Sequence, residues 1–132
     1  MYQIKRSEVL SETLQIEYHG KMLEVKCEMN LANQMKDYAK ANRSVSVLMS
    51  KAQSDILDDP KNLGQAIMAL FVLAFGEEQT QKIVDFYDND HVTMLLDIMP
   101  FFNEVVTPMF TKQRKDKMDQ LRKNAKRRRL FK

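Results

Sequence analysis

The chain has little of what catalytic and disulfide-bonded proteins depend on. Among its 132 residues there is one cysteine, Cys27, so no internal disulfide can form and the composition suits a reducing compartment. The two histidines, His19 and His91, lie far apart, and no motif brings Cys27 beside either of them. The three glycines are isolated, which excludes a glycine-rich phosphate loop. These shortages predict a protein that is not an enzyme and holds no cofactor or metal.

Long apolar runs are also missing. The most apolar segment, 63–75, spans about 20 Å as a helix, whereas crossing a bilayer takes about 20 residues. The opening residues MYQIKRSEVLSETLQ place no apolar run behind their basic residues, so we expect no signal peptide. We therefore predict no membrane association and a buried core helix at 63–75.

The N-terminal part has the alternation of a β-hairpin. In TLQIEYHGKMLEVKCEMN, apolar and polar residues alternate on both sides of His19-Gly20-Lys21, where Gly20 can take the positive φ of a tight turn. We predict a hairpin over about 13–29. A lone hairpin is marginal in water, so it should rest on helices or pair its edge with another chain.

The rest of the chain has helical periodicity. We predict helices over about 31–57, 60–75, 77–87 and 91–110, with Asn30 as the first N-cap and Gly76 ending the second segment. Asn42 either sets the register of the first helix or marks a break before Ser44, and the weak local propensity favours the break. Pro100 and Pro108 predict kinks or breaks in the last helix. The expected fold is a mainly α, α+β domain over 1–111 with kinked helices.

The helix predicted at 91–110 has two adjacent apolar stripes. The first holds Val92, Leu95, Met99, Phe102, Val106 and Met109, and the second holds Met94, Ile98, Phe101 and Val105. A helix that packs on one side needs an apolar arc of only about 100°. The excess predicts a contact with another helix, another subunit or a client protein, and ten methionines suit a surface that tolerates varied partners.

Charge is divided unevenly along the chain. Residues 112–132 hold eleven Lys and Arg against two Asp, a net charge of +9, which leaves −6 for the first 111 residues of a chain whose total is +3. The cations that cluster most closely are Arg122, Lys123, Lys126, Arg127, Arg128 and Arg129. Such a tail, helical or flexible, suits nucleic-acid phosphates or an acidic protein surface, and a small nucleic-acid-binding regulator is the alternative function.

One polar segment, Asp88-Asn89-Asp90-His91, has metal-ligand residue types. It lacks the glycine, the later glutamate and the ligand number of a calcium loop. We interpret it as a helix-capping turn.

The run FGEEQTQKIVDFYDNDHVTMLLDIMPFFNEVVTPMF, over 75–110, resembles the C-terminal half of the small tail assembly chaperones of long-tailed bacteriophages and prophages of Gram-positive bacteria. Those proteins are similar in having an N-terminal hairpin, an FGEEQ-like helix start, an aromatic-acidic turn, an IMPF-N-EV-like segment and a charged tail. The tail of this chain is more basic than the family pattern.

The resemblance implies a chaperone in the cytoplasm of the bacterial host. It would bind the hydrophobic helices of the tape-measure protein, keep them soluble while the tail tube assembles, and self-associate in many copies along its client. A longer frameshifted product is common in such proteins. The residues that we predict to form the client or subunit surface are Met94, Leu95, Ile98, Met99, Phe102, Val105, Met109 and Phe110.

Overall fold

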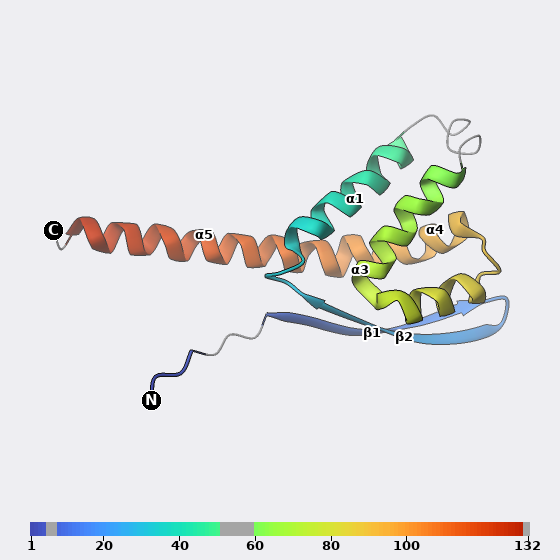
Figure 1. Cartoon of the computed structure of the whole chain (residues 1–132), viewed down its shortest axis with the longest axis horizontal. Coiled ribbons are helices and arrows are strands. Elements are labelled where there is room, and N and C mark those ends of the chain that lie inside the picture. Colours follow the sequence, from blue (N-terminus) through green and yellow to red (C-terminus); the bar gives the residue numbers. More distant parts are fainter. Residues whose placement is uncertain (5–7, 51–59, 131–132) are drawn as a thin grey trace.

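The computed structural model describes residues 1–4, 8–50 and 60–130 (Figure 1). An antiparallel hairpin, β1 (Val9–Tyr18) and β2 (Lys21–Asn30), lies along one side of a group of helices. The helices are α1 (Met35–Ser50), α3 (Pro60–Phe86), α4 (His91–Phe101), the π-helical turn η1 (Phe102–Val106) and α5 (Thr107–Leu130). The predicted mainly α fold with an N-terminal hairpin is confirmed. The expected helix end near 57 lies outside the described residues.

The hairpin is longer than its sequence signal. Its register runs from Val9 opposite Asn30 to Tyr18 opposite Lys21, which leaves His19 and Gly20 as a two-residue turn. Both turn residues have positive φ, 51° and 76°, as the twist of such a turn requires. One face of the sheet carries the buried side chains and packs on the helices, while the other face is exposed and mostly polar.

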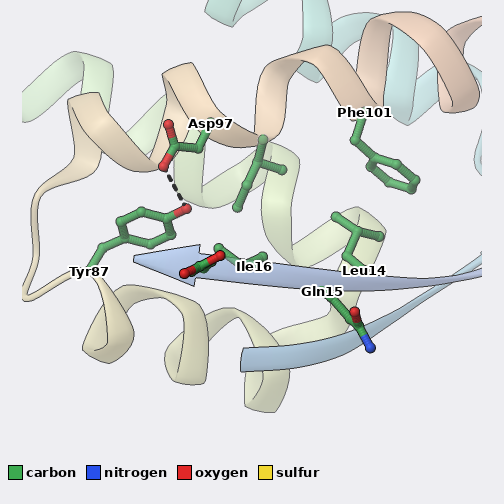
Figure 2. A pocket seen from close by; sticks show the side chains of 8 residues that line it. Leu14, Gln15, Ile16, Tyr87, Asp97 and Phe101 are labelled. Carbon is green, nitrogen blue, oxygen red and sulfur yellow. Dashed lines mark hydrogen bonds between the residues drawn. The ribbon is translucent and has the colours of Figure 1, made fainter. Parts of the chain in front are cut away.

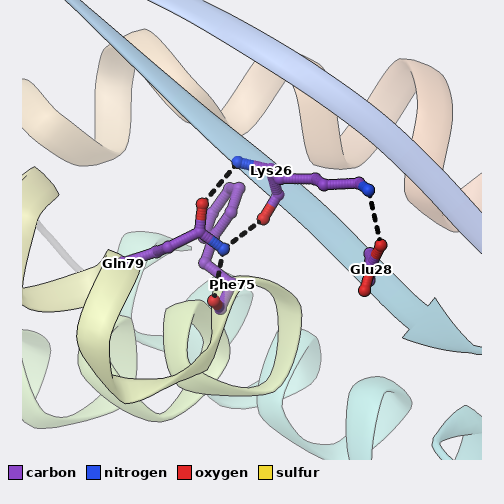
Figure 3. A network of polar contacts seen from close by, with 4 residues as sticks. All are labelled: Lys26, Glu28, Phe75 and Gln79. Atoms are coloured by element: carbon purple, nitrogen blue, oxygen red, sulfur yellow. Dashed lines mark hydrogen bonds and ion pairs between the residues drawn. The ribbon is translucent and has the colours of Figure 1, made fainter.

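The free edge of β2 is covered by a side chain of α3 (Figure 3). Gln79 accepts a hydrogen bond from the Lys26 backbone N–H at 2.6 Å and donates one to the Lys26 carbonyl at 2.7 Å. The same amide donates to the Phe75 carbonyl at 3.0 Å. The side-chain amide of Gln79 thus forms hydrogen bonds both with the edge of β2 and with the backbone beside the Gly76 kink. These hydrogen bonds join the sheet to α3.

The predicted break at Asn42-Arg43-Ser44 is wrong, because α1 runs through these residues without interruption. Tyr38 and Val45 on either side of them are buried, and this packing outweighs the weak local propensity. Ser44 caps no helix, since its hydroxyl donates to the Lys40 carbonyl one turn earlier. Asn30 ends β2 and its side chain accepts from the Asn33 N–H, so it stabilises a turn before α1 and does not cap α1.

Gly76 divides α3 as predicted. Its φ of 80° and ψ of 166° are non-helical, although the helix continues on both sides. The residues of 63–75 that line the core include Leu63, Ile67, Leu70, Phe71, Ala74 and Phe75. The predicted buried helix is confirmed, and the kink turns the following segment along the hairpin.

Of the kinks or breaks expected at Pro100 and Pro108, no break occurs. The chain is helical without a gap from His91 to Leu130, with the π-helical turn η1 between Pro100 and Pro108. In this turn the Thr107 N–H donates to the Phe102 carbonyl, five residues back. The wider turn lies directly before Pro108, whereas Pro100 lies inside α4 and N-terminal to this turn. We call the continuous helical run 91–130 the rod.

Candidate functional site

A groove of about 430 Å³ lies between β1 and α4 (Figure 2). Four lining residues are apolar: Leu14, Ile16, Ile98 and Phe101. The other four are Gln15, Glu17, Tyr87 and Asp97. Side chains alternate along β1, so Glu17 and Gln15 turn their side chains to the outer face of the hairpin that also carries Met22. The groove thus has an apolar floor and one carboxylate, that of Asp97, and no lining side chain is cationic.

The turn before α4 sets the position of the rod beside the groove. Asp88 and Asn89 both have positive φ, 52° and 64°, which reverses the chain after α3. Asp90 caps α4, since its carboxylate accepts from the Thr93 N–H at 3.1 Å and from the Thr93 hydroxyl at 2.7 Å. These bonds hold the pKa of Asp90 below its usual value. The interpretation of this segment as a capping turn is confirmed.

Tyr87 and Asp97 connect the turn to α4 inside the groove. The Tyr87 hydroxyl donates a hydrogen bond to the Asp97 carboxylate at 3.0 Å, as Figure 2 shows. The ring is fully buried and lies 4.7 Å from the Tyr18 ring, centroid to centroid. Burial, followed by the bond and charge of Asp97, raises the pKa of Tyr87. The Asp97 side chain is therefore held at the groove with one oxygen occupied.

The backbone of β1 adds unpaired polar groups to the groove. The sheet has two strands, so within the described residues no strand pairs with the outer edge of β1. Lys26 turns its N–H and carbonyl away from β1 toward Gln79, so its partner Thr13 also turns its backbone groups outward. The same alternation turns the backbone of Gln15 and Glu17 toward the groove side.

Most of the predicted client surface is core. Six of the eight residues are buried: Met94, Leu95, Ile98, Met99, Phe102 and Phe110. Val105 is half-buried, and Met109 is 37% exposed. The prediction that these residues form an accessible surface is therefore wrong for all except the last two.

The reason is that other elements cover the rod on more than one side. Phe102 lies 5.5 Å from Phe71 and 6.0 Å from Phe75 of α3, centroid to centroid. Tyr38 of α1 stacks on Phe110 at 4.8 Å. Two apolar stripes on one helix thus serve two packing interfaces within the protomer, which helical periodicity alone does not distinguish from an external contact.

A different part of the rod is exposed and apolar. Leu96 is 62% exposed and Val92 is 41% exposed. Pro100 is also exposed and continues the same spacing of four residues, so the three lie on one face of α4. The spacing of four is present in the sequence. It is hard to recognise there because buried apolar residues lie between these three positions.

A second, smaller cavity of about 280 Å³ lies between α1 and α5. Its lining includes Tyr38, Asn42, Arg43 and Arg114. The Tyr38 hydroxyl is within 2.7 Å of the Thr107 hydroxyl, whereas the Asn42 side-chain oxygen is buried without a hydrogen bond. This cavity separates the two helices where α5 leaves the body.

The basic tail is the outer part of α5. In Figure 1 this helix extends away from the other elements. Lys117 pairs with Glu8 at 3.1 Å, and Arg122 lies 4.0 Å from Asp119 of its own helix. Of the predicted cluster, Arg122, Lys123, Lys126 and Arg127 are exposed, while the side chains of Arg128 and Arg129 lie outside the described residues.

The one cysteine of the chain is poorly placed to act as a nucleophile. Cys27 is fully buried, and burial together with Glu12 and Glu28 raises the pKa of its thiol to about 12. Such a thiol stays protonated and is a poor nucleophile at neutral pH. Within ranges 1–4, 8–50 and 60–130, no three His, Cys, Asp or Glu side chains come close enough to hold a metal ion. No helix in those ranges is long and apolar enough to span a bilayer.

Comparison with models of known protein families, with curated proteins and with solved structures finds no match to this chain.

Proposed function

We propose that the chain is a bacteriophage tail assembly chaperone that binds hydrophobic helices of a tape-measure protein and keeps them soluble in the host cytoplasm during tail tube assembly. The observation that carries the proposal is the exposed apolar face of α4, formed by Val92, Leu96 and Pro100. Large apolar side chains in such positions favour contact with a partner.

The placement of the family-like segment 75–110 supports the proposal. This segment supplies Tyr87, Asp97, Ile98 and Phe101, which make up one side of the groove, and it supplies the whole exposed face of α4. The residues that resemble the chaperone family therefore include both the core of the rod and the surface open to a client.

The proposed client site differs from the one predicted by periodicity. It consists of two sides of α4: the exposed side chains Val92, Leu96 and Pro100 on one side, and the half-buried side chains Leu14 and Phe101 at the groove on the other. An amphipathic client helix could lay its apolar side along α4, as helices do in hydrophobic grooves. Because the surface is open and shallow, it would accept many helical sequences, as a chaperone of a long client requires.

Co-expression with a tape-measure protein of a long-tailed bacteriophage tests the proposal. The wild-type chain should increase the soluble fraction of that client, and Leu96→Asp should abolish the increase. Met22→Asp is a matched control, because Met22 is 61% exposed on the far face of the hairpin. If the client stays insoluble with the wild-type chain, or if both variants act alike, the proposal is wrong.

A nucleic-acid-binding role is the second candidate, because α5 exposes Arg122, Lys123, Lys126 and Arg127 to solvent. Binding through phosphates should weaken steeply as salt rises, with a slope set by the number of contacts. The helix offers no aromatic side chain among its described residues beyond Phe110, which is buried. Salt-sensitive binding of duplex DNA that is lost without residues 122–132 would favour this candidate over the chaperone.

A further inference from the structure

We propose that the outer edge of β1 binds an extended peptide segment as a third strand, and that this segment carries an apolar side chain and, two residues away, a lysine or arginine that pairs with Asp97. The binding site is the groove between β1 and α4 (Figure 2). The partner is a strand-forming segment, whereas the proposed function places a helix along α4. The contact needs no tape-measure protein, so it stands or fails separately from that function.

The hairpin has one covered edge and one open edge. On β2, the Gln79 side-chain amide bonds to both the N–H and the carbonyl of Lys26, as the backbone of an added strand would (Figure 3). On β1, the outward backbone groups at the groove are those of Gln15 and Glu17. Among the described residues, none forms a hydrogen bond with these groups. This edge therefore keeps donors and acceptors with which another chain can pair.

The lining of the groove indicates that its β1 side is formed partly by backbone. Four consecutive residues, 14–17, line the groove, although successive side chains of a strand point to opposite faces. Figure 2 shows the Gln15 side chain turned away from α4. Gln15 and Glu17 therefore reach the groove through their main-chain atoms, which are the atoms that an added strand would bind.

The side chains of α4 lie at a spacing that suits a strand. Figure 2 shows Leu14 and Phe101 at one end of the groove and Asp97 with Tyr87 toward the other. Residues 97 and 101 are about 6 Å apart along the helix, and side chains on one face of a strand repeat about every 6.8 Å. Successive inward side chains of an added strand would thus meet the half-buried Leu14 and Phe101 and then Asp97.

Asp97 determines the charge that the segment must carry. Its carboxylate accepts from the Tyr87 hydroxyl at 3.0 Å through one oxygen, and within the described part of the chain the other oxygen has no partner. Asp97 is exposed, and none of the described residues that line the groove is cationic. A lysine or arginine of the segment would pair with this carboxylate, whereas an acidic residue would be repelled. Main-chain hydrogen bonds would supply affinity and the side chains specificity.

Fluorescence anisotropy with a synthetic peptide tests the strand pairing. The peptide is labelled and blocked at both ends, and Thr alternates with Val except that one Val is replaced by Lys. It should bind the wild-type chain. An added strand directs alternate N–H groups to β1 and to solvent. Methylation of alternate backbone nitrogens should therefore abolish binding for one set of positions and leave the other set unaffected.

The charge of the peptide supplies the second measurement. The wild-type chain should bind the Lys peptide about fivefold more tightly than the same peptide with Glu in place of Lys. Asp97→Asn should remove this preference while it keeps an acceptor for the Tyr87 hydroxyl. Glu17→Gln is the matched control and should keep the preference, because the Glu17 side chain lies on the outer face of the hairpin with Met22.

Proline substitution in β1 locates the pairing. Gln15→Pro removes an outward N–H at the groove, and Ser11→Pro removes one at an equivalent outward position beyond the groove lining. Only Gln15→Pro should abolish binding of the Lys peptide.

Three results would overturn the proposal. These are no binding by the wild-type chain, equal effects of the two methylated sets, and a preference for Lys that survives in Asp97→Asn. Peptide binding that weakens as the chain concentration rises would also contradict it, because a second copy would then occupy the edge.

Discussion

Phe110 of α5 stacks on Tyr38 of α1, with ring centroids 4.8 Å apart and planes 12° from parallel. The Tyr38 hydroxyl also lies 2.7 Å from the Thr107 hydroxyl one turn earlier in α5. This pair joins the start of α5 to the body. A residue that periodicity assigned to a client surface is therefore part of the structure that holds the rod in place.

Phe110→Ala should lower the free energy of unfolding by about 3 kcal/mol, because it removes a buried ring and leaves a cavity against Tyr38. Its neighbour provides the control: Met109 is 37% exposed, so Met109→Ala should cost only about 0.5 kcal/mol. Urea unfolding of both variants checks this. Equal losses of stability would mean that Phe110 is not packed as described.

The two glycines of α3 should respond in opposite directions to the same substitution. Gly76→Ala should cost about 2 kcal/mol, since φ of 80° strains any residue with a Cβ atom. No atom lies within 4 Å of a Cβ at this position, so the cost comes from the backbone alone.

Gly64→Ala should instead raise the free energy of unfolding by about 0.5 kcal/mol, because Gly64 is helical and the new methyl group meets only His91 at an ordinary 3.9 Å. Thermal unfolding of both alanine variants measures the pair. A stable Gly76→Ala chain would show that the kink is dispensable.

Stability should fall in mildly alkaline solution because of Cys27. Its pKa rises on folding to about 12, so the folded chain keeps the thiol proton that the unfolded chain releases near its ordinary pKa of about 8.5. The resulting stabilisation is complete below that ordinary pKa and is lost as pH rises toward the folded value. Between about pH 8 and about pH 9.5 the loss should be about 1 kcal/mol.

Urea unfolding of the wild-type chain and of Cys27→Ala over this pH interval measures the effect. The variant has lower stability overall because its side chain is smaller, but its stability should change less with pH. If the two chains lose stability in parallel, the pH dependence does not come from this thiol.

Asn42→Ala should stabilise the chain by about 0.5 kcal/mol. Its side-chain oxygen is buried without a hydrogen bond, and alanine has the better helix propensity at a position inside α1. Thermal unfolding is sufficient to detect the change. A clear loss of stability would indicate that the amide has a partner in solution.

Local signals in the sequence predicted the elements that depend on neighbouring residues. Alternation around Gly20 located the hairpin, Gly76 located the kink in α3, and Asp90 proved to be the cap of α4. Each of these depends on backbone conformation or on a side chain within three residues. Such features follow from residues close together in the sequence, so a sequence pattern can predict them.

The failures concern packing between distant elements. The sequence does not show that the packing of Tyr38 and Val45 would keep α1 continuous across Asn42. It also does not show that a π-helical turn would form before Pro108 in place of a break. It also does not show that two stripes on the rod face α3 and α1. The groove combines Leu14 and Glu17 with Asp97 and Phe101, about eighty residues away, and only the register of β1 beside α4 brings them together.

Hydrogen–deuterium exchange of the chain with and without a tape-measure protein tests the proposed chaperone function most directly. The proposal predicts that client binding slows exchange in β1 near Leu14 and in α4 around Leu96, while α1 near Val47, an exposed residue outside the proposed site, is unchanged. Exchange that is unaltered throughout β1 and α4 in the presence of a soluble client would contradict it.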